Sequence, residues 1–346
     1  MQLQAIVNPL VNWYNNCKRS LPWRDEPTPY RVWVSEIMLQ QTRVDPAIPY
    51  FERFVSTLPD IAALASADEE TVLKLWEGLG YYSRVRNLQK AAKVVQETYG
   101  GVLPRDPALL IKLPGVGEYT AGAIASIAYQ VPVPAVDGNV LRVISRLTAD
   151  ERDIAAPETK RLMQERLQSI MPDHRPGDFN QALMDLGATV CLPNGAPRCE
   201  ACPLAHLCEA KKAGRCEELP VKSKKQAPVT EKKTVFLLRY EEQVALLKRP
   251  ENGLLAGLWE FPNTAGHLTK KDALLQVEQW GLSAKAAEPL PKAKHVFTHR
   301  VWEMNGFSVI LSDKNDAFVW ADTDRLSKEF TLPTAFRAYQ KLLKKE

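Results

Sequence analysis

The sequence contains no run of apolar residues that approaches the roughly 20 needed to cross a membrane. Its first residues, MQLQAIVNPLVNWY, also have neither a basic stretch nor a small-residue cleavage site of the kind that marks a secretory signal peptide. We therefore expect no membrane segment and no export, and we predict a cytoplasmic protein.

An excess of charge of one sign is nearly absent as well. The 45 Lys and Arg residues and the 41 Asp and Glu residues leave a formal net charge of only +4. A balance this mildly basic permits binding to nucleic acid but does not require it.

Cysteine is scarce, with six in 346 residues, and its distribution is uneven. Four cysteines follow the pattern C-x7-C-x2-C-x5-C: Cys191, Cys199, Cys202 and Cys208. Such clustering indicates a metal site in a reducing compartment and argues against a disulfide framework. Four thiolates suit zinc as well as an iron–sulfur cluster. Cys17 and Cys216 are left over, and we predict that both are free thiols rather than ligands.

The length and the hydrophobic fraction of 45% suit two domains, each with its own core. Residues 1–212 show helical spacing interrupted by prolines, residues 213–231 read as a polar, basic linker, and residues 232–346 contain strand patterns. We expect strands at Thr234–Leu238 and Val244–Lys248, which form a hairpin, and near residues 295–297, 301–311 and 317–319, with helices at Lys270–Trp280 and Pro333–Leu343.

The run LPGVG, residues 113–117, is a tight turn ahead of a small-residue helix. Glycines at positions 115 and 117 allow backbone conformations that other residues resist. The N–H groups of Gly115, Val116, Gly117 and the helix start would then form an anion site suited to a DNA phosphate. An ordinary turn between two packed helices explains the run equally well.

Several further motifs occur in order along the chain. They are WVSEIMLQQT from Trp33, GLGYYSRVRNL from Gly78, VDGNV around Asp137, FNQALMDLGATVC from Phe179, and the cysteine cluster. Together with LPGVG they resemble adenine DNA glycosylases of the MutY kind over nearly the whole chain. The resemblance implies an all-α helix-hairpin-helix domain that carries a [4Fe–4S] cluster on the four clustered cysteines. The usual first spacing in the family is x6, so the loop between Cys191 and Cys199 has one extra residue here.

The C-terminal segment resembles the Nudix-like domain of the same glycosylases, through LWEFPN at residues 258–263 and HVFTHRVWEM at residues 295–304. This implies an α+β fold for residues 232–346. A catalytic Nudix helix needs paired glutamates for magnesium, whereas the run TKKDALLQVEQWGL offers only Glu278. We therefore expect a recognition module without pyrophosphatase activity.

The resemblance assigns catalytic roles to three residues. Glu36 lies in an apolar segment, where it is either a solvated side chain or a buried acid with a raised pKa; by resemblance it protonates the adenine. Asp137 is an N-cap by position, and by resemblance it stays ionised to stabilise the oxocarbenium ion. Tyr119 lies where endonuclease III relatives carry a nucleophilic lysine, so strand cleavage is not expected. An ordinary half-buried tyrosine would look the same.

The same resemblance assigns a second set of side chains to DNA and to the bases. The pocket and adenine edge would be met by Arg24 and Gln181, and the opened base stack by Gln40, Gln41, Thr42 and Tyr81. The 8-oxoguanine base would be met by Phe297, Thr298 and His299, where Thr298 replaces the commoner serine and keeps its hydroxyl. Without the resemblance, each of these residues reads as ordinary packing or as part of a turn.

We therefore predict a monomeric, monofunctional glycosylase that removes adenine mispaired with 8-oxoguanine or guanine in duplex DNA. Two alternatives remain. One is an endonuclease III-like glycosylase/lyase for oxidised pyrimidines, which Tyr119 and the C-terminal segment disfavour. The other is a catalytically silent DNA-binding protein, which the presence of both Glu36 and Asp137 disfavours.

Overall fold

The computed structural model describes residues 2–223 and 227–344. The chain forms two compact units, each considered by itself. The helical unit comprises Met1–Ala67 with Arg84–Lys224, and the sheet unit comprises Asp68–Ser83 with Lys225–Glu346.

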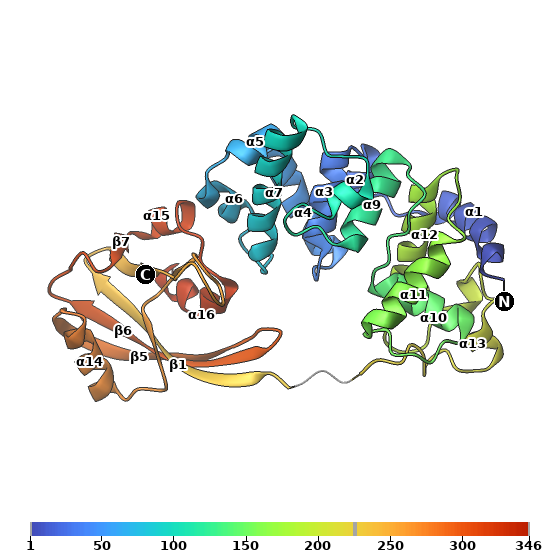
Figure 1. Cartoon of the computed structure of the whole chain (residues 1–346). Coiled ribbons are helices and arrows are strands. Elements are labelled where there is room, and N and C mark those ends of the chain that lie inside the picture. Colours follow the sequence, from blue (N-terminus) through green and yellow to red (C-terminus); the bar gives the residue numbers. More distant parts are fainter. Residues whose placement is uncertain (1, 224–226, 345–346) are drawn as a thin grey trace. The chain divides into compact units, whose positions relative to one another are not determined.

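The helical unit is all-α in the part that the structure describes, as predicted (Figure 1). Its helices are η1 (Leu3–Ile6), α1 (Val7–Cys17), α2 (Pro22–Asp25), α3 (Pro29–Leu39), α4 (Val44–Thr57), α5 (Ile61–Ser66), α7 (Ser83–Tyr99), α8 (Pro107–Leu110), α9 (Glu118–Tyr129), α10 (Gly138–Thr148), α11 (Pro157–Gln168), α12 (Pro176–Thr189), η2 (Cys199–Ala201) and α13 (Glu209–Lys212). Local sequence sets several starts. Thr28 caps α3 by accepting from Arg31 N–H and is followed by Pro29, and Asp60 caps α5.

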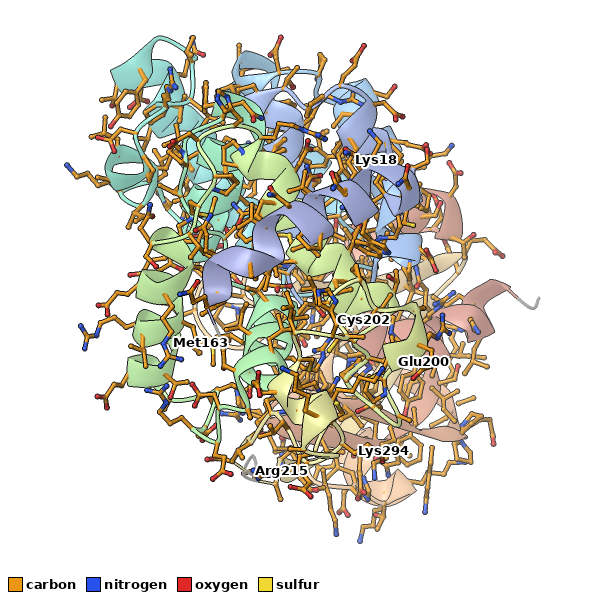
Figure 2. All side chains as sticks on the ribbon, turned by 90° about the vertical axis from the view of Figure 1, so that its right-hand side faces the viewer. Lys18, Met163, Glu200, Cys202, Arg215 and Lys294 are labelled. Carbon is orange, nitrogen blue, oxygen red and sulfur yellow. The ribbon has the colours of Figure 1, made fainter. Side chains whose placement is uncertain are left out.

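Helix α12 lies against α1, α9 and α10 in the core of the helical unit. Phe179, Leu183 and Leu186 of α12 are buried together with Ile144 of α10. Gly187 permits the close approach of the two helices, because a Cβ there would lie 2.6 Å from the Asn139 Cβ. Met163 of α11 is also buried in this core, whereas the side chain of Glu200 is exposed; both residues are labelled in Figure 2. The start of α10 is thereby fixed against α12.

The sheet unit is α+β, as predicted for the C-terminal segment. It contains α6 (Glu69–Leu75), β1 (Val229–Tyr240), β2 (Gln243–Lys248), β3 (Trp259–Glu260), β4 (Asn263–Ala265), α14 (Lys270–Gln279), β5 (Ala284–Val296), β6 (Arg300–Leu311), β7 (Val319–Ala321), α15 (Thr323–Lys328), η3 (Thr334–Phe336), α16 (Arg337–Gln340) and η4 (Lys341–Lys344). The strand order is β3-β2-β1-β6-β5, with β4 paired to β1 and β7 paired to β2. Strands β1 and β6 are parallel, and the other pairs are antiparallel.

Helices cover both faces of this sheet, so β1 is continuously apolar at its centre (Figure 1). Val235 and Leu237 belong to the core that includes Phe336 and Tyr339, whereas Phe236 and Leu238 belong to the core under α14. A strand that is buried on both faces has this pattern. The C-terminal helix predicted at Pro333–Leu343 is instead three short turns, η3, α16 and η4.

The sheet unit also includes residues 68–83, which the sequence analysis placed in the first domain. Lys74 Nζ donates to the Phe330 carbonyl at 3.1 Å, and Glu77 Oε1 accepts from Leu332 N–H at 3.0 Å. Lys74 and Glu77 also form an ion pair at 2.7 Å. The helical pattern of this segment was visible in the sequence, but its spacing does not say which core it joins.

The predicted linker, residues 213–231, is shorter in the structure. Leu219 is buried in the helical unit, where its carbonyl accepts from Arg146 Nε at 2.8 Å, and Val221 pairs with Ile154 N–H. Strand β1 already begins at Val229. The polar, basic composition of the segment gave no sign that Leu219 and Val221 belong to the helical unit, or that Val229 begins a strand. Residues 224–226 of the segment lie outside the described part.

Candidate active site

A cavity of about 420 Å³ opens in the helical unit among α2, α3, α9, α10 and α12. Residues predicted as catalytic or base-contacting line it together: Arg24, Glu36, Thr42, Tyr119, Asp137 and Gln181. These residues are spread over more than 150 positions of the sequence. The fold thus brings the predicted acid, the second carboxylate and the predicted adenine-contacting amide around one space.

Glu36 lies on α3 and is only 6% exposed, which excludes the solvated alternative. Burial raises the pKa of its carboxyl to about 7. A hydrogen bond from the Tyr119 hydroxyl to Glu36 Oε2 opposes the rise, and the nearby charge of Asp137 adds to it. A carboxyl with a pKa near 7 can hold a proton at neutral pH and give it to a bound base.

Asp137 caps α10 and has both carboxylate oxygens engaged. Oδ1 accepts from Val140 N–H at 2.7 Å, and Oδ2 accepts from Asn139 Nδ2 at 2.7 Å. Burial raises the pKa of this carboxyl, while these hydrogen bonds and the charge of Arg142 oppose the rise. Asp137 is therefore an N-cap, as its position predicts, and it also lines the cavity. Its ionised state during the reaction stays a prediction.

Two residues that the sequence analysis missed hold Asp137 in place. Asn139 Oδ1 accepts from Arg142 Nη2 at 2.9 Å, and the same guanidinium donates to the carbonyls of Gly187 and Cys191, both at 2.8 Å. An uninterrupted series of hydrogen bonds thus runs from Asp137 through Asn139 and Arg142 to Cys191. The available signal was an arginine within the apolar helix segment GNVLRVISRL.

Arg24 is fixed by a buried carboxylate. Its Nη1 and Nη2 atoms donate to Asp185 at 2.8 and 3.0 Å, and Arg19 donates to the same carboxylate. Burial alone would raise the pKa of Asp185, but the hydrogen bonds and charges of Arg24 and Arg19 hold it below its usual value. Arg24 is thereby a rigid part of the cavity wall, with its positive charge near Glu36.

The turn at residues 113–117 has the predicted geometry. Gly115 has φ +76°, and a Cβ there would also lie 2.8 Å from the Asn87 Cβ, so glycine is required twice over. Val116 is buried, and Gly117, the N-cap residue of α9, has no side chain that could accept from the first N–H groups of the helix. This arrangement fits an anion at the start of α9.

The segment after α3 is held by Arg84 of α7. The guanidinium donates to the carbonyls of Ile37, Met38 and Gln40 and to Thr42 Oγ1. Gln41 has φ +61°, a left-handed conformation that is uncommon for a residue with a side chain. Gln40 Nε2 forms a long bond of 3.4 Å with Thr120 Oγ1. Three of the residues predicted to probe the base stack therefore lie on one strained, anchored turn.

The sheet unit brings together two of the predicted DNA contacts. The hydroxyls of Tyr81 and Thr298 are 2.7 Å apart and share a hydrogen bond, and both side chains are exposed. Thr298 and His299 lie in a turn that the Phe297 N–H closes by donating to the Arg300 carbonyl. The Phe297 ring packs edge-on against His295 and Trp302. Phe297 thus anchors the turn, and Thr298 lies at its exposed tip.

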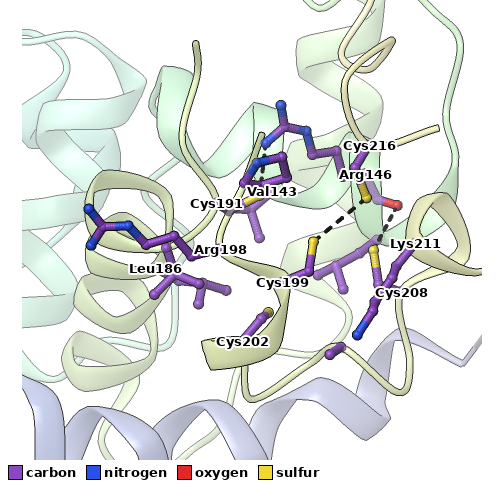
Figure 3. A pocket seen from close by; sticks show the side chains of 14 residues that line it. Val143, Arg146, Leu186, Cys191, Arg198, Cys199, Cys202, Cys208, Lys211 and Cys216 are labelled. Carbon is purple, nitrogen blue, oxygen red and sulfur yellow. Dashed lines mark hydrogen bonds between the residues drawn. The ribbon is translucent and has the colours of Figure 1, made fainter. Parts of the chain in front are cut away.

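The four clustered cysteines line one cavity beneath α10 and α12 (Figure 3). Among the described residues, no three His, Cys, Asp or Glu side chains are arranged to hold a single metal ion. The donor set itself, four thiols facing one space, fits an iron–sulfur cluster, which spreads its ligands around a larger core than one ion does. Arg146 Nη1 donates to the Cys191 sulfur at 3.3 Å. Cys17 is exposed, whereas Cys216 lies in the lining of this cavity.

Comparisons with known proteins agree with both units. Residues 34–169 match the HhH-GPD superfamily of base excision DNA repair proteins, and residues 234–342 match the NUDIX domain. A thermostable thymine-DNA glycosylase has a TM-score of 0.56, 27% identity, and coverage of 61% of this chain and 96% of its own. Endonuclease III in a non-covalent DNA complex has a TM-score of 0.52 and 25% identity, with 62% and 96% covered. The helical unit therefore has the fold of a base excision repair glycosylase.

Sequence relatives define the family more narrowly. The adenine DNA glycosylase of Buchnera aphidicola (strain Bp) is 33% identical over 90% of this chain and 89% of its own length. The rat enzyme is 34% identical over 96% and 77%, and the human enzyme is 37% identical over 86% and 65%, so the chain spans just under two thirds of the human protein. The chain belongs to the adenine DNA glycosylase family, and it is a DNA glycosylase of base excision repair. Among the described residues no helix is both long and apolar enough to span a membrane.

Proposed function

We propose that this enzyme hydrolyses the glycosidic bond of adenine mispaired with 8-oxoguanine or guanine in duplex DNA, without cleaving the strand. The observation that carries the proposal is the placement of two carboxyl groups, the buried Glu36 and the half-buried Asp137, around one cavity of about 420 Å³. Two carboxyl groups in different surroundings are the usual means of breaking a glycosidic bond.

The roles follow from what surrounds each group. Glu36, whose pKa is about 7, donates a proton to N7 of adenine, so that the base departs with the bonding electrons. The Asp137 carboxylate, oriented by Val140 N–H and Asn139, stabilises or captures the sugar cation. Water then replaces the base on the face from which it left. Tyr119 offers a phenol where a lyase would need an amine, so no Schiff base forms.

DNA is the substrate, and we assign the remaining predicted residues to it. The turn Gly115–Gly117 binds a backbone phosphate, while Gln40, Gln41, Thr42 and Tyr81 occupy the opened base stack. Gln181 and Arg24 meet the extruded adenine, and the turn Phe297–His299 reads 8-oxoguanine. The enzyme would act as a monomer in the cytoplasm, at the nucleoid.

We also propose that Cys191, Cys199, Cys202 and Cys208 hold a [4Fe–4S] cluster. When bound, the cluster would cross-link residues 191–208 and bind them to the core of the helical unit. Protein purified without oxygen should contain about four irons per chain. Zinc in place of iron and sulfide would refute this assignment.

The decisive experiment measures base release and strand nicking separately on three duplexes that contain A:8-oxoguanine, A:G or thymine glycol. We expect adenine release from the first two and nicking only after alkaline treatment. Nicking of the thymine-glycol duplex would instead favour the endonuclease III-like alternative. Tight binding with no release from any duplex would favour the silent DNA-binding alternative.

A further inference from the structure

The cavity of the clustered cysteines is lined by five thiols rather than four. The fifth is Cys216, which the sequence analysis set aside, and its sulfur lies 4.0 Å from the Cys199 sulfur (Figure 3). Cys17, the sixth cysteine, is exposed on α1 and is not part of the lining.

The course of the chain fixes Cys216 at this place. Helix α13 ends at Lys212, and Gly214, with φ +71°, turns the backbone so that Arg215 N–H reaches the Ala210 carbonyl at 2.8 Å. Arg215 then pairs with Glu218 and with Glu151 of the helical unit. Buried Leu219 follows three residues after Cys216. The thiol is therefore held between two anchored residues and does not lie on a loose tail.

The two cysteines that end the long loop are held differently. Cys199 N–H donates to the Pro197 carbonyl at 2.9 Å, and its carbonyl accepts from Cys202 N–H at 3.2 Å, so these backbone bonds stay within its own segment. The sulfur of Cys191 accepts a hydrogen bond from Arg146, and its carbonyl accepts one from Arg142. The Cys191 N–H donates to the Leu186 carbonyl. Cys199 begins the short turn η2 after the loop that has one residue more than the family's usual spacing. Its sulfur has the Cys216 thiol as a close neighbour.

We propose that Cys216 is a reserve ligand of the cluster, able to take the iron of Cys199 when the Cys199 thiolate is missing. The inference rests on the cluster proposed above. In the exchange, the Cys216 thiol loses its proton to solvent and its sulfur forms the iron bond that the residue at position 199 no longer supplies. No electron is transferred, and the charge and number of thiolate ligands stay the same.

The test compares iron and acid-labile sulfide per chain, together with the visible absorbance, in anaerobically purified variants. Cys199→Ser should keep most of its cluster, whereas Cys199→Ser/Cys216→Ser should lose it. Cys202→Ser is the matched control, because it removes a ligand from the same short turn and should lose the cluster with or without Cys216. Cys216→Ser alone should keep the cluster on its four original ligands.

A second readout locates the ligand directly. After alkylation by iodoacetamide under anaerobic conditions, trypsin separates the peptide Cys216–Lys222 from the peptide Cys199–Lys211. In wild-type protein Cys216 should be alkylated, while the three cysteines of the peptide Cys199–Lys211 should be protected. In Cys199→Ser, Cys216 should become protected, and an iron chelator should restore its alkylation.

The proposal fails if Cys199→Ser is as poor in iron, or as insoluble, as Cys202→Ser. It also fails if Cys216 stays open to alkylation in an iron-loaded Cys199→Ser protein. Wild-type protein that contains no iron and sulfide would refute the cluster proposal and, with it, the inference about Cys216. Iron-loaded wild type with an iron-poor Cys199→Ser would refute only the inference.

Discussion

At the scale of single residues, the carboxyl groups of Glu36 and Asp137 differ in their exposure and in the hydrogen-bond donors that they meet. Glu36 is surrounded by the buried residues of α3, and within the described part of the chain its one side-chain hydrogen-bond partner is Tyr119, so its neutral form is favoured. Asp137 is half-buried, and burial raises the pKa of its carboxyl, while its two donors and the nearby charge of Arg142 oppose that rise. The number of donors that each carboxylate meets is therefore what separates the proposed acid, Glu36, from the proposed anion, Asp137.

The first prediction concerns Glu36→Gln. An amide keeps the shape of the side chain and can still accept from Tyr119, but it cannot supply a proton. Single-turnover adenine release should fall by about a hundredfold or more, while equilibrium binding to the A:8-oxoguanine duplex stays close to wild type. Release at a near-normal rate would remove Glu36 from the role of the acid.

The second prediction concerns pH. Because Glu36 must be protonated to act and its pKa is about 7, the single-turnover rate should fall as the pH rises through about 7. With the usual pKa of 4.5 for a glutamic acid, the rate would already fall at a far lower pH. The pH at which the rate falls therefore measures how far burial raises the pKa of Glu36. Binding must be measured at each pH to separate chemistry from affinity. A rate that is constant well above neutral pH contradicts this assignment.

The third prediction concerns the shared hydrogen bond of Thr298 and Tyr81. Thr298→Val keeps the shape but removes the hydroxyl, and one such bond is worth about 0.5–1.5 kcal/mol. The preference for A:8-oxoguanine over A:G should therefore narrow by roughly several-fold to tenfold. Tyr81→Phe is the matched control, because it removes the partner hydroxyl and leaves Thr298 free to bond the lesion.

The two variants separate two explanations of the hydroxyl pair. If Thr298 reads the lesion, Thr298→Val should change the preference more than Tyr81→Phe does. If the bond only holds the turn, both variants should change it equally. Binding and excision should be measured at one salt concentration, because phosphate contacts dominate the affinity.

The sequence predicted which single residues line the cavity, but not the hydrogen bonds that these residues form. Motif positions identified Glu36, Asp137 and Tyr119, and the structure places all three on one cavity. The bond from Tyr119 to Glu36 and the series through Asn139 and Arg142 could not be predicted. They depend on side-chain directions set by tertiary packing, for which spacing along the chain carries no signal.

At the scale of elements, the geometry of the cavity depends on how closely α12 approaches the start of α10. The start of α10 was predictable, because Asp137 is an N-cap by its position. The close approach itself was not predictable, because a glycine within a helix pattern gives no information about its neighbour. Gly187 allows it, and its carbonyl also accepts from Arg142.

The fourth prediction is that Gly187→Ala lowers both stability and activity. A Cβ 2.6 Å from the Asn139 Cβ must displace α10 or α12, and such overpacking typically costs about 1–3 kcal/mol. Asn139 orients Asp137, so the rate of adenine release should fall in the fraction that stays folded. Gly138→Ala, where an added Cβ meets nothing within 4 Å, is the control for the stability loss.

The measurements are the urea midpoint and the single-turnover rate of folded enzyme. A Gly187→Ala protein as stable as wild type would show that the helices can separate at little cost. Normal catalysis in a destabilised Gly187→Ala protein would show that Asn139 need not stay in place.

At the scale of the whole molecule, length and composition predicted two domains, but they did not predict that residues 68–83 belong to the second one. The strand patterns located the sheet unit, because Val235–Leu238 and Val301–Leu311 are rich in branched and aromatic residues. The inclusion of residues 68–83 was invisible to sequence reasoning, since it depends on bonds from Lys74 and Glu77 to residues more than 250 positions away. The sheet unit therefore depends on a piece of chain that lies between the catalytic helices in sequence.

The fifth prediction concerns removal of residues 232–346. Both proposed catalytic carboxyl groups, Glu36 and Asp137, precede this segment. Adenine release from A:G should therefore be affected less than the preference for A:8-oxoguanine, because the truncated chain lacks Thr298 and His299. The segment Glu69–Glu77 would also lose its bonds to Phe330 and Leu332, and its amide hydrogens should exchange faster. Excision on the two duplexes and hydrogen exchange by mass spectrometry test the two halves of this prediction.

Full-length Lys74→Ala/Glu77→Ala separates these two effects of truncation. It removes the bonds of Lys74 to the Phe330 carbonyl and of Glu77 to Leu332 N–H but keeps the turn Phe297–His299. Faster exchange at residues 69–77 with an unchanged lesion preference would assign lesion reading to that turn, because only the truncation removes it. The double variant could instead lose the preference for A:8-oxoguanine as fully as the truncated chain does. The contribution of the sheet unit to that preference would then be to hold residues 68–83, which include Tyr81, in place. A truncated enzyme with the full preference would assign lesion reading to the helical unit.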